Sequence, residues 1–131
     1  MRSDELLLTP VGGTGLWAKP LSGALDETNA RYLIEAILDE VRRTGRVCVY
    51  LDLKRVEAVD EFILTRLVVL TFRLAGAGGR LFTFQVRPIV YAAIRSHGLT
   101  GLLRARRDLP DPPFRDAACR GSRRLAKSRM R

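Results

Sequence analysis

The chain has 131 residues, 47% of them apolar, which suits a single domain with one hydrophobic core. Its richest apolar run, 62–75, is interrupted by Arg66 and Arg73, so no stretch reaches the roughly 18 apolar residues of a membrane span. The net charge is +9, but six basic residues and no acidic one lie in 119–131, which predicts a basic, disordered tail after a domain of residues 1–118.

The N-terminus does not have the pattern of a secretory signal, because Asp4 and Glu5 follow its one basic residue and the next apolar run is short. We therefore expect a soluble, cytoplasmic protein in a reducing compartment, where Cys48 and Cys119 remain thiols. The separation of the two cysteines matches no metal-ligand spacing. Cys48 falls in an apolar segment and is expected to be an inert core residue.

Two short apolar runs, 6–10 and 16–19, flank three glycines and predict two strands that are joined by a turn. This turn lacks the Lys-Ser or Lys-Thr pair of a phosphate-binding loop, so it does not predict a nucleotide site. Apolar residues then recur at helical spacing. They predict an amphipathic helix that is capped by Asp26 or Thr28 and ended by Gly45.

The rest of the chain continues this alternation of strands and helices. The segment 46–53, RVCVYLDL, predicts a strand that is buried on both faces. A helix predicted over 60–77 is apolar almost all round, which indicates deep burial or a partner over its outer face. A strand over 81–86, a helix over 88–95 that begins with proline, and one more short helix over 111–118 follow. The pattern predicts βαβ units around a central sheet.

Four segments follow one another at a characteristic spacing, and they are LSGALDETNARYL (21–33), RVCVYLDLKRVEAVDE (46–61), GAGGRLFTF (76–84) and VYAAIRSHGLTGLL (90–103). In this order they resemble the STAS family, the domain of sulphate transporters and bacterial anti-sigma factor antagonists. The match is without a gap from Asp60 to Leu81. The resemblance implies an α/β fold with a central mixed sheet of four to five strands and helices packed largely on one side.

In antagonists of this family, a helix begins Asp-Ser-Ser-Gly-Leu, and a partner kinase phosphorylates the first serine. Here the same positions read DEFIL from Asp60 to Leu64, so Glu61 stands at the phosphoacceptor-equivalent position. Glu61 either fixes one binding state as a partial phosphate mimic, or marks a domain that binds without phosphorylation control. It is also a favourable first-turn residue beside the N-cap candidate Asp60, whatever its function. Thr65, one turn further, is a poor substitute acceptor.

Helical spacing places four residues of 60–77 on one outer face, and they are Phe62, Arg66, Val69 and Arg73. The opposite face is expected to form the core with Ile63, Leu64, Leu67, Val68, Leu70 and Leu74. An aromatic side chain between arginines is typical of an interface anchor, and equally of arginines that cover a half-buried apolar residue. The expected partner-binding set is Asp26, Asn29, Asp60, Glu61, Phe62, Thr65, Arg66, Val69 and Arg73. Helix capping alone also accounts for Asp26 and Asn29.

The resemblance implies a non-catalytic interaction module that binds an anti-sigma factor or a histidine-kinase-like serine kinase in partner-switching regulation of transcription. We expect a monomer or weak homodimer without cofactor, metal or catalytic residues. His97 is the only histidine, and the adjacent Ser96 is expected to point elsewhere. The alternatives are an accessory domain of a transporter or lipid-trafficking ATPase complex, and nucleic-acid binding through the tail. The tail has no aromatic residue for base stacking, so nucleic acid is the less favoured partner.

Overall fold

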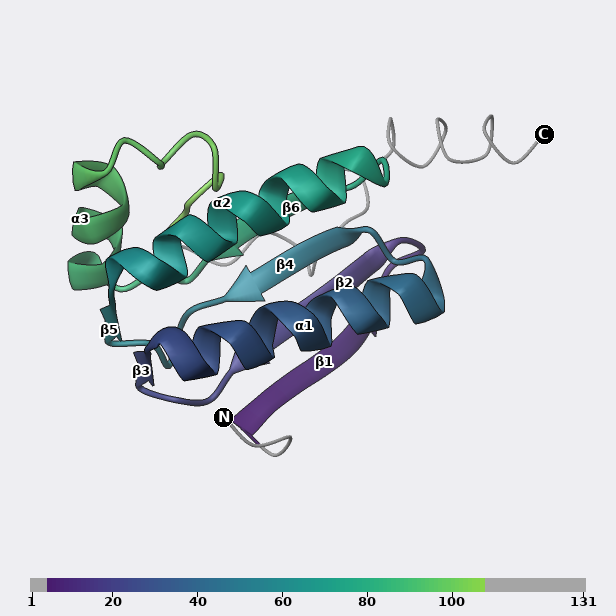
Figure 1. Cartoon of the computed structure of the whole chain (residues 1–131), viewed down its shortest axis with the longest axis horizontal. Coiled ribbons are helices and arrows are strands. Elements are labelled where there is room, and N and C mark those ends of the chain that lie inside the picture. The colour runs from purple at the N-terminus through teal and green to yellow at the C-terminus, as the bar shows by residue number, and fades with distance from the viewer. Residues whose placement is uncertain (1–4, 108–131) are drawn as a thin grey trace.

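A computed structural model describes residues 5–107 of the chain. The helix predicted over 111–118 and the tail predicted over 119–131 lie outside the described residues. The described part forms a mixed four-stranded sheet in the order β1-β2-β4-β6 (Figure 1). Its strands are β1 (Leu6–Val11), β2 (Gly15–Pro20), β4 (Cys48–Asp52) and β6 (Arg80–Phe84). β1 is antiparallel to β2, and β2, β4 and β6 are parallel, so the predicted mixed sheet is confirmed.

A second, two-stranded sheet lies at one end of the domain, where β3 (Ala24–Leu25) pairs in parallel with β5 (Ala58–Val59). Three helices complete the described fold, and they are α1 (Glu27–Thr44), α2 (Glu61–Gly76) and α3 (Pro88–Ser96). α1 and α2 pack against each other on one side of the sheet, and α3 lies beside β5 (Figure 1). The predicted arrangement of helices largely on one side is therefore confirmed.

The ends of α1 are set by local chemistry that the sequence predicted. Asp26 has extended backbone dihedrals, and its side chain accepts a hydrogen bond of 2.9 Å from the Asn29 N–H, so Asp26 is the cap and Thr28 is not. Gly45 ends the helix with φ of 73°, in the left-handed region where glycine has no steric penalty. The stripe that α1 buries consists of Ala30, Leu33, Ile34, Ile37, Leu38 and Val41.

α2 begins in the same way, because the Asp60 side chain accepts a hydrogen bond of 3.0 Å from the Ile63 N–H. Its buried face consists of Ile63, Leu64, Leu67, Leu70, Thr71 and Leu74. The prediction that Val68 belongs to this face is wrong, since Val68 is only partly buried. Thr71 takes the place instead, and it satisfies its hydroxyl by donating to the Leu67 carbonyl at 2.9 Å.

The face of the sheet opposite α1 and α2 carries an aromatic cluster, because alternate residues of a strand point to opposite sides. Tyr50 stacks on Phe82 with ring centroids 5.2 Å apart and meets Phe84 edge-on at 6.3 Å. Cys48 is fully buried in this cluster. Cys48 is disulfide-bonded in the structure, so the prediction that it remains a thiol is wrong.

Candidate functional site: the paired starts of α1 and α2

The pairing of β3 with β5 brings the N-termini of α1 and α2 side by side (Figure 1). In this pairing Leu25 is opposite Val59. The next residue after each of them is the cap of a helix, Asp26 for α1 and Asp60 for α2. A glutamate occupies the first helical position after each cap. The chain thus repeats Ala-Leu-Asp-Glu as Ala-Val-Asp-Glu, and two similar acidic helix starts form one edge of the domain.

Glu27 is the acidic residue of this edge that sequence reasoning missed. Its signal was the short repeat ALDE and AVDE, which becomes informative only when the two tetrapeptides are known to pair. Glu27 lies on the exposed side of α1, and its carboxylate is 3.8 Å from the Arg31 guanidinium. An exposed pair of this kind contributes little to stability and leaves the carboxylate accessible to a partner.

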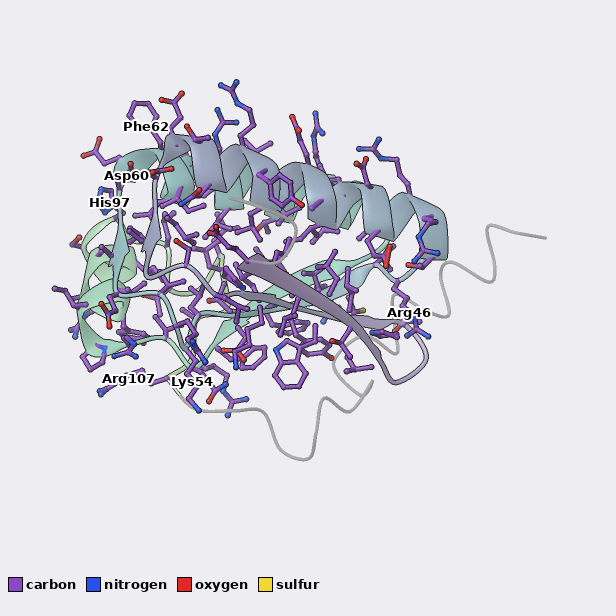
Figure 2. The ribbon with its side chains drawn as sticks, turned by 90° about the horizontal axis from the view of Figure 1, so that it is seen from below. Arg46, Lys54, Asp60, Phe62, His97 and Arg107 are labelled. Carbon is purple, nitrogen blue, oxygen red and sulfur yellow. The ribbon has the colours of Figure 1, made fainter. Side chains whose placement is uncertain are left out.

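Glu61 presents its carboxylate to solvent at the start of α2. Its side chain is 87% exposed, and Oε1 is 3.8 Å from Nε2 of His97. The neighbouring Asp60 carboxylate is held by its capping hydrogen bond to Ile63, so the two acidic residues have different roles. The Phe62 ring stands outward beside them (Figure 2), and it is 58% exposed. An exposed aromatic side chain next to an exposed carboxylate is thus the main feature of this helix start.

His97 is brought to the site by α3, although it lies far from Glu61 in the sequence. The prediction that Ser96 points elsewhere is wrong, since Ser96 Oγ is 3.3 Å from His97 Nδ1. Both groups also lie 2.9 Å from the Ala93 carbonyl oxygen, which can only accept hydrogen bonds. The Ser96 hydroxyl is therefore committed to the backbone, and the pair does not form an activated nucleophile of the serine–histidine kind.

The remaining predicted residues are divided between two places. Asn29 is part of the α1 start, where its side-chain amide donates to the Ala24 carbonyl at 3.1 Å. Arg66, Val69 and Arg73 line a groove between α1 and α2. The α1 side of this groove is formed by Arg31, Ile34, Glu35, Leu38, Asp39 and Arg42. Phe62 is not among the lining residues, so the predicted single face of α2 is divided between the helix start and the groove.

Thr65 does not offer a free hydroxyl at the site. Its Oγ1 donates a hydrogen bond of 3.0 Å to the Glu61 carbonyl, one turn earlier in α2. Among residues 5–107, no group of three or more His, Cys, Asp or Glu side chains is placed to hold a metal ion. In the same part of the chain, every helix is too short or too polar to cross a membrane.

Comparison with known proteins agrees with this architecture. The family profile of the STAS domain matches residues 18–111. A candidate anti-sigma factor antagonist from Thermotoga maritima is 19% identical with a TM-score of 0.67, covering 77% of this chain and 85% of that chain. The Bacillus cell-fate determinant SpoIIAA, in its phosphorylated form, is 15% identical with a TM-score of 0.62, covering 96% of this chain and 99% of that chain.

A transporter protein has the same fold. A sulfate transporter family protein from Wolinella succinogenes is 18% identical with a TM-score of 0.65, covering 91% of this chain and 93% of that chain. No curated protein sequence matches the chain. The structural likenesses show the fold, and the profile match covers most of the sequence. The chain belongs to the STAS domain family.

Proposed function

We propose that this domain is a cytoplasmic, non-catalytic interaction module of the anti-sigma factor antagonist type. It binds an anti-sigma factor or a related histidine-kinase-like serine kinase through the paired starts of α1 and α2, and so participates in partner switching that regulates transcription. The observation that carries the proposal is the exposed Glu61 carboxylate at the phosphoacceptor-equivalent position, next to the exposed Phe62 ring. Two of the structural neighbours bear antagonist or cell-fate names, which supports the same class.

In this proposal the partner contact does not depend on phosphorylation of the domain. Glu61 is encoded in the sequence and offers one carboxylate, whereas phosphoserine carries about −1.5 to −2 at neutral pH with three acceptor oxygens. Thr65 is no substitute, because its hydroxyl is bonded to the Glu61 carbonyl within the helix. The domain therefore holds one binding state, in which the Glu61 carboxylate is offered to the partner.

The residues of the site have separate roles in the proposed contact. Phe62 is the apolar anchor, since more than half of its side chain is exposed. Asp26, Asn29 and Asp60 hold the two helix starts in place through hydrogen bonds to backbone groups. Exposed aromatic anchors supply most of the binding energy in many interfaces, and fixed polar residues around them exclude water.

Phe62→Asp is expected to weaken partner binding by about 30-fold, the cost of removing one interface anchor. The matched control is Phe72→Asp, which makes the same change on the same helix at a ring that is 64% exposed. Both variants and the wild-type chain are used for affinity capture from the source cytoplasm, and the recovered proteins are identified by mass spectrometry. An anti-sigma factor or serine kinase that is lost with Phe62→Asp alone agrees with the proposal.

Two results of the same capture would contradict it. Recovery of a transporter ATPase with all three chains would favour an accessory transporter domain, in line with the sulfate transporter family protein among the structural neighbours. Loss of the antagonist-type partner with Phe72→Asp to the same extent would place the contact elsewhere on α2.

Glu61→Ser is expected to gain a phosphoryl group from the captured kinase and ATP, while the wild-type chain gains none. The substitution restores a hydroxyl at the first position of α2, where the helix N-terminus favours added negative charge. Intact-protein mass spectrometry after incubation measures the transfer. Glu27→Ser is the control, because it creates a hydroxyl at the first position of α1. Equal phosphorylation of the two variants would show that the kinase does not distinguish the α2 start.

A further inference from the structure

A long stretch of the chain between Glu61 and Asp108 carries basic residues alone. From Phe62 to Arg107 the sequence contains no aspartate or glutamate. The basic residues of this stretch are all arginines, and they are Arg66, Arg73, Arg80, Arg87, Arg95, Arg104, Arg106 and Arg107. Since α3 and the segments on either side of it fall within this stretch, their surface carries positive charge without acidic residues of their own.

Two adjoining hollows lie on the surface of α3, and both include Pro88 and Arg107. The first also includes Lys54 and Arg87, and the second also includes Tyr91 and Arg95. We call these six residues the α3 surface. Lys54 comes from the loop between β4 and β5, so the surface joins three separate segments of the chain. Neither hollow has an acidic side chain in its lining.

The cations of the α3 surface are largely uncompensated within residues 5–107. The Lys54 ammonium and the guanidinium groups of Arg95 and Arg107 have no hydrogen bond or ion pair with another described side chain. The Arg87 side chain is held in one orientation, because its Nε donates a hydrogen bond of 2.8 Å to the Lys54 carbonyl. Its Nη1 lies 3.9 Å from the exposed Glu57 carboxylate, an ion pair that solvent screens.

Apolar groups lie among these cations. Pro88 lines both hollows, the partly buried Tyr91 lines one of them, and Ile89, next to Pro88 on α3, is 69% exposed. Arginine and tyrosine are among the residues that are enriched at protein interfaces relative to the rest of a surface. The hollows are open depressions rather than enclosed cavities, which suits a protein segment better than a buried small molecule.

We propose that the α3 surface is a second docking site, which binds an acidic segment of a partner protein. Aspartate and glutamate side chains of that segment pair with Lys54, Arg95 and Arg107, and an apolar residue packs on Pro88 and Tyr91. This site is separate from the paired helix starts, since Figure 2 shows Lys54 and Arg107 at the lower edge of the domain, away from Asp60, Phe62 and His97. The proposal does not depend on the identity of the partner that binds at Glu61.

The test is an NMR titration of the full chain with a ten-residue peptide of glutamates and one central leucine. Amide shifts are expected at Lys54, Arg107 and 86–95, and they should weaken as ionic strength rises. The double substitution Arg95→Glu with Arg107→Glu is expected to weaken binding at these residues about tenfold. Arg66→Glu with Arg73→Glu is the matched control, because it changes the net charge equally in the groove between α1 and α2.

Three results would overturn the proposal. Equal weakening by the control pair would show that only net charge matters. Shifts confined to other residues would show that the α3 surface does not bind the acidic segment. Stronger binding of duplex DNA at the same amides would assign the surface to nucleic acid. Retention of the wild-type spectrum outside α3 in the double variant shows that the substitution leaves the fold intact, and Phe62→Asp should leave the peptide titration unchanged.

Discussion

Gly79→Ala is expected to lower the free energy of unfolding by about 3 kcal/mol or more, at the upper end of the cost of overpacking. A Cβ at this position would lie 2.0 Å from the Val47 carbonyl oxygen and 2.5 Å from the Val47 Cβ. The Val47 carbonyl cannot move aside freely, because it accepts the Arg80 N–H at 3.1 Å where β6 begins beside β4. The added methyl group would therefore clash with a backbone carbonyl that the hydrogen bond to Arg80 holds in place.

The matched control for this prediction is Gly76→Ala, three residues earlier. A Cβ at Gly76 meets nothing within 4 Å, and alanine has the higher helix propensity, so stability is expected to stay equal or rise slightly. Thermal unfolding followed by circular dichroism compares the two variants, with a fall in Tm on the order of 10 °C for Gly79→Ala alone. Similar melting of both would mean that the α2–β6 turn can absorb a side chain.

The helix boundaries could be predicted from the sequence because they depend on neighbouring residues. Asp26 and Asp60 cap their helices by bonds to the N–H three residues ahead, and Gly45 supplies the left-handed residue after α1. The buried strand β4 was also predictable, since an apolar run of this length is suited to a sheet covered on both faces. The outline of the fold follows from these local signals.

Other features depend on contacts between distant segments, and the sequence did not predict them. β3 and β5 have two residues each, too few to show an alternating pattern, yet their pairing aligns the starts of α1 and α2. The contact of His97 with Glu61 exists only because α3 lies beside β5. Val68 and Thr71 both border the core face of α2, and tertiary packing decides that Thr71 is the buried one.

The candidate site was predicted in part for the same reason. The position of Glu61 followed from the Asp-to-Leu motif, and the solvent exposure of Phe62 followed from helical spacing. The groove residues Arg66 and Arg73 were placed on the same face as Phe62, but the packing of α1 against α2 separates them from it. Spacing along one helix cannot show where a second helix covers its side.

Asp52→Ala is expected to lower the free energy of unfolding by about 3 kcal/mol, because three donors lose a buried acceptor. Asp52 is fully buried at the end of β4. Its carboxylate accepts hydrogen bonds from Trp17 Nε1 at 3.2 Å, from Gln85 Nε2 at 3.0 Å and from the Lys54 N–H at 3.0 Å. These bonds connect β2, the loop after β4 and the turn before α3 through one carboxylate. Because Lys54 lies in that loop, the same bonds help to position the α3 surface.

Asp52→Asn separates loss of hydrogen bonds from loss of volume. The asparagine keeps one side-chain oxygen, which can accept from the Lys54 N–H. The flexible Gln85 amide can turn so that its oxygen accepts from the new NH₂ group. Trp17 Nε1 is then the donor that loses this acceptor. We therefore expect a loss of about 1 to 2 kcal/mol, between wild type and Asp52→Ala. Urea unfolding measures the order of the three chains.

Trp17 is the only tryptophan, so its indole N–H resonance and fluorescence report on the Asp52 contact directly. Both signals should change in Asp52→Asn even where the rest of the spectrum is retained. Trp17→Phe removes the donor, and in that background Asp52→Asn should cost less than in the wild-type chain, because the two residues share one bond. An equal cost in both backgrounds would show that the Trp17 bond does not stabilise the fold, and that Asp52 acts through Gln85 and Lys54 alone.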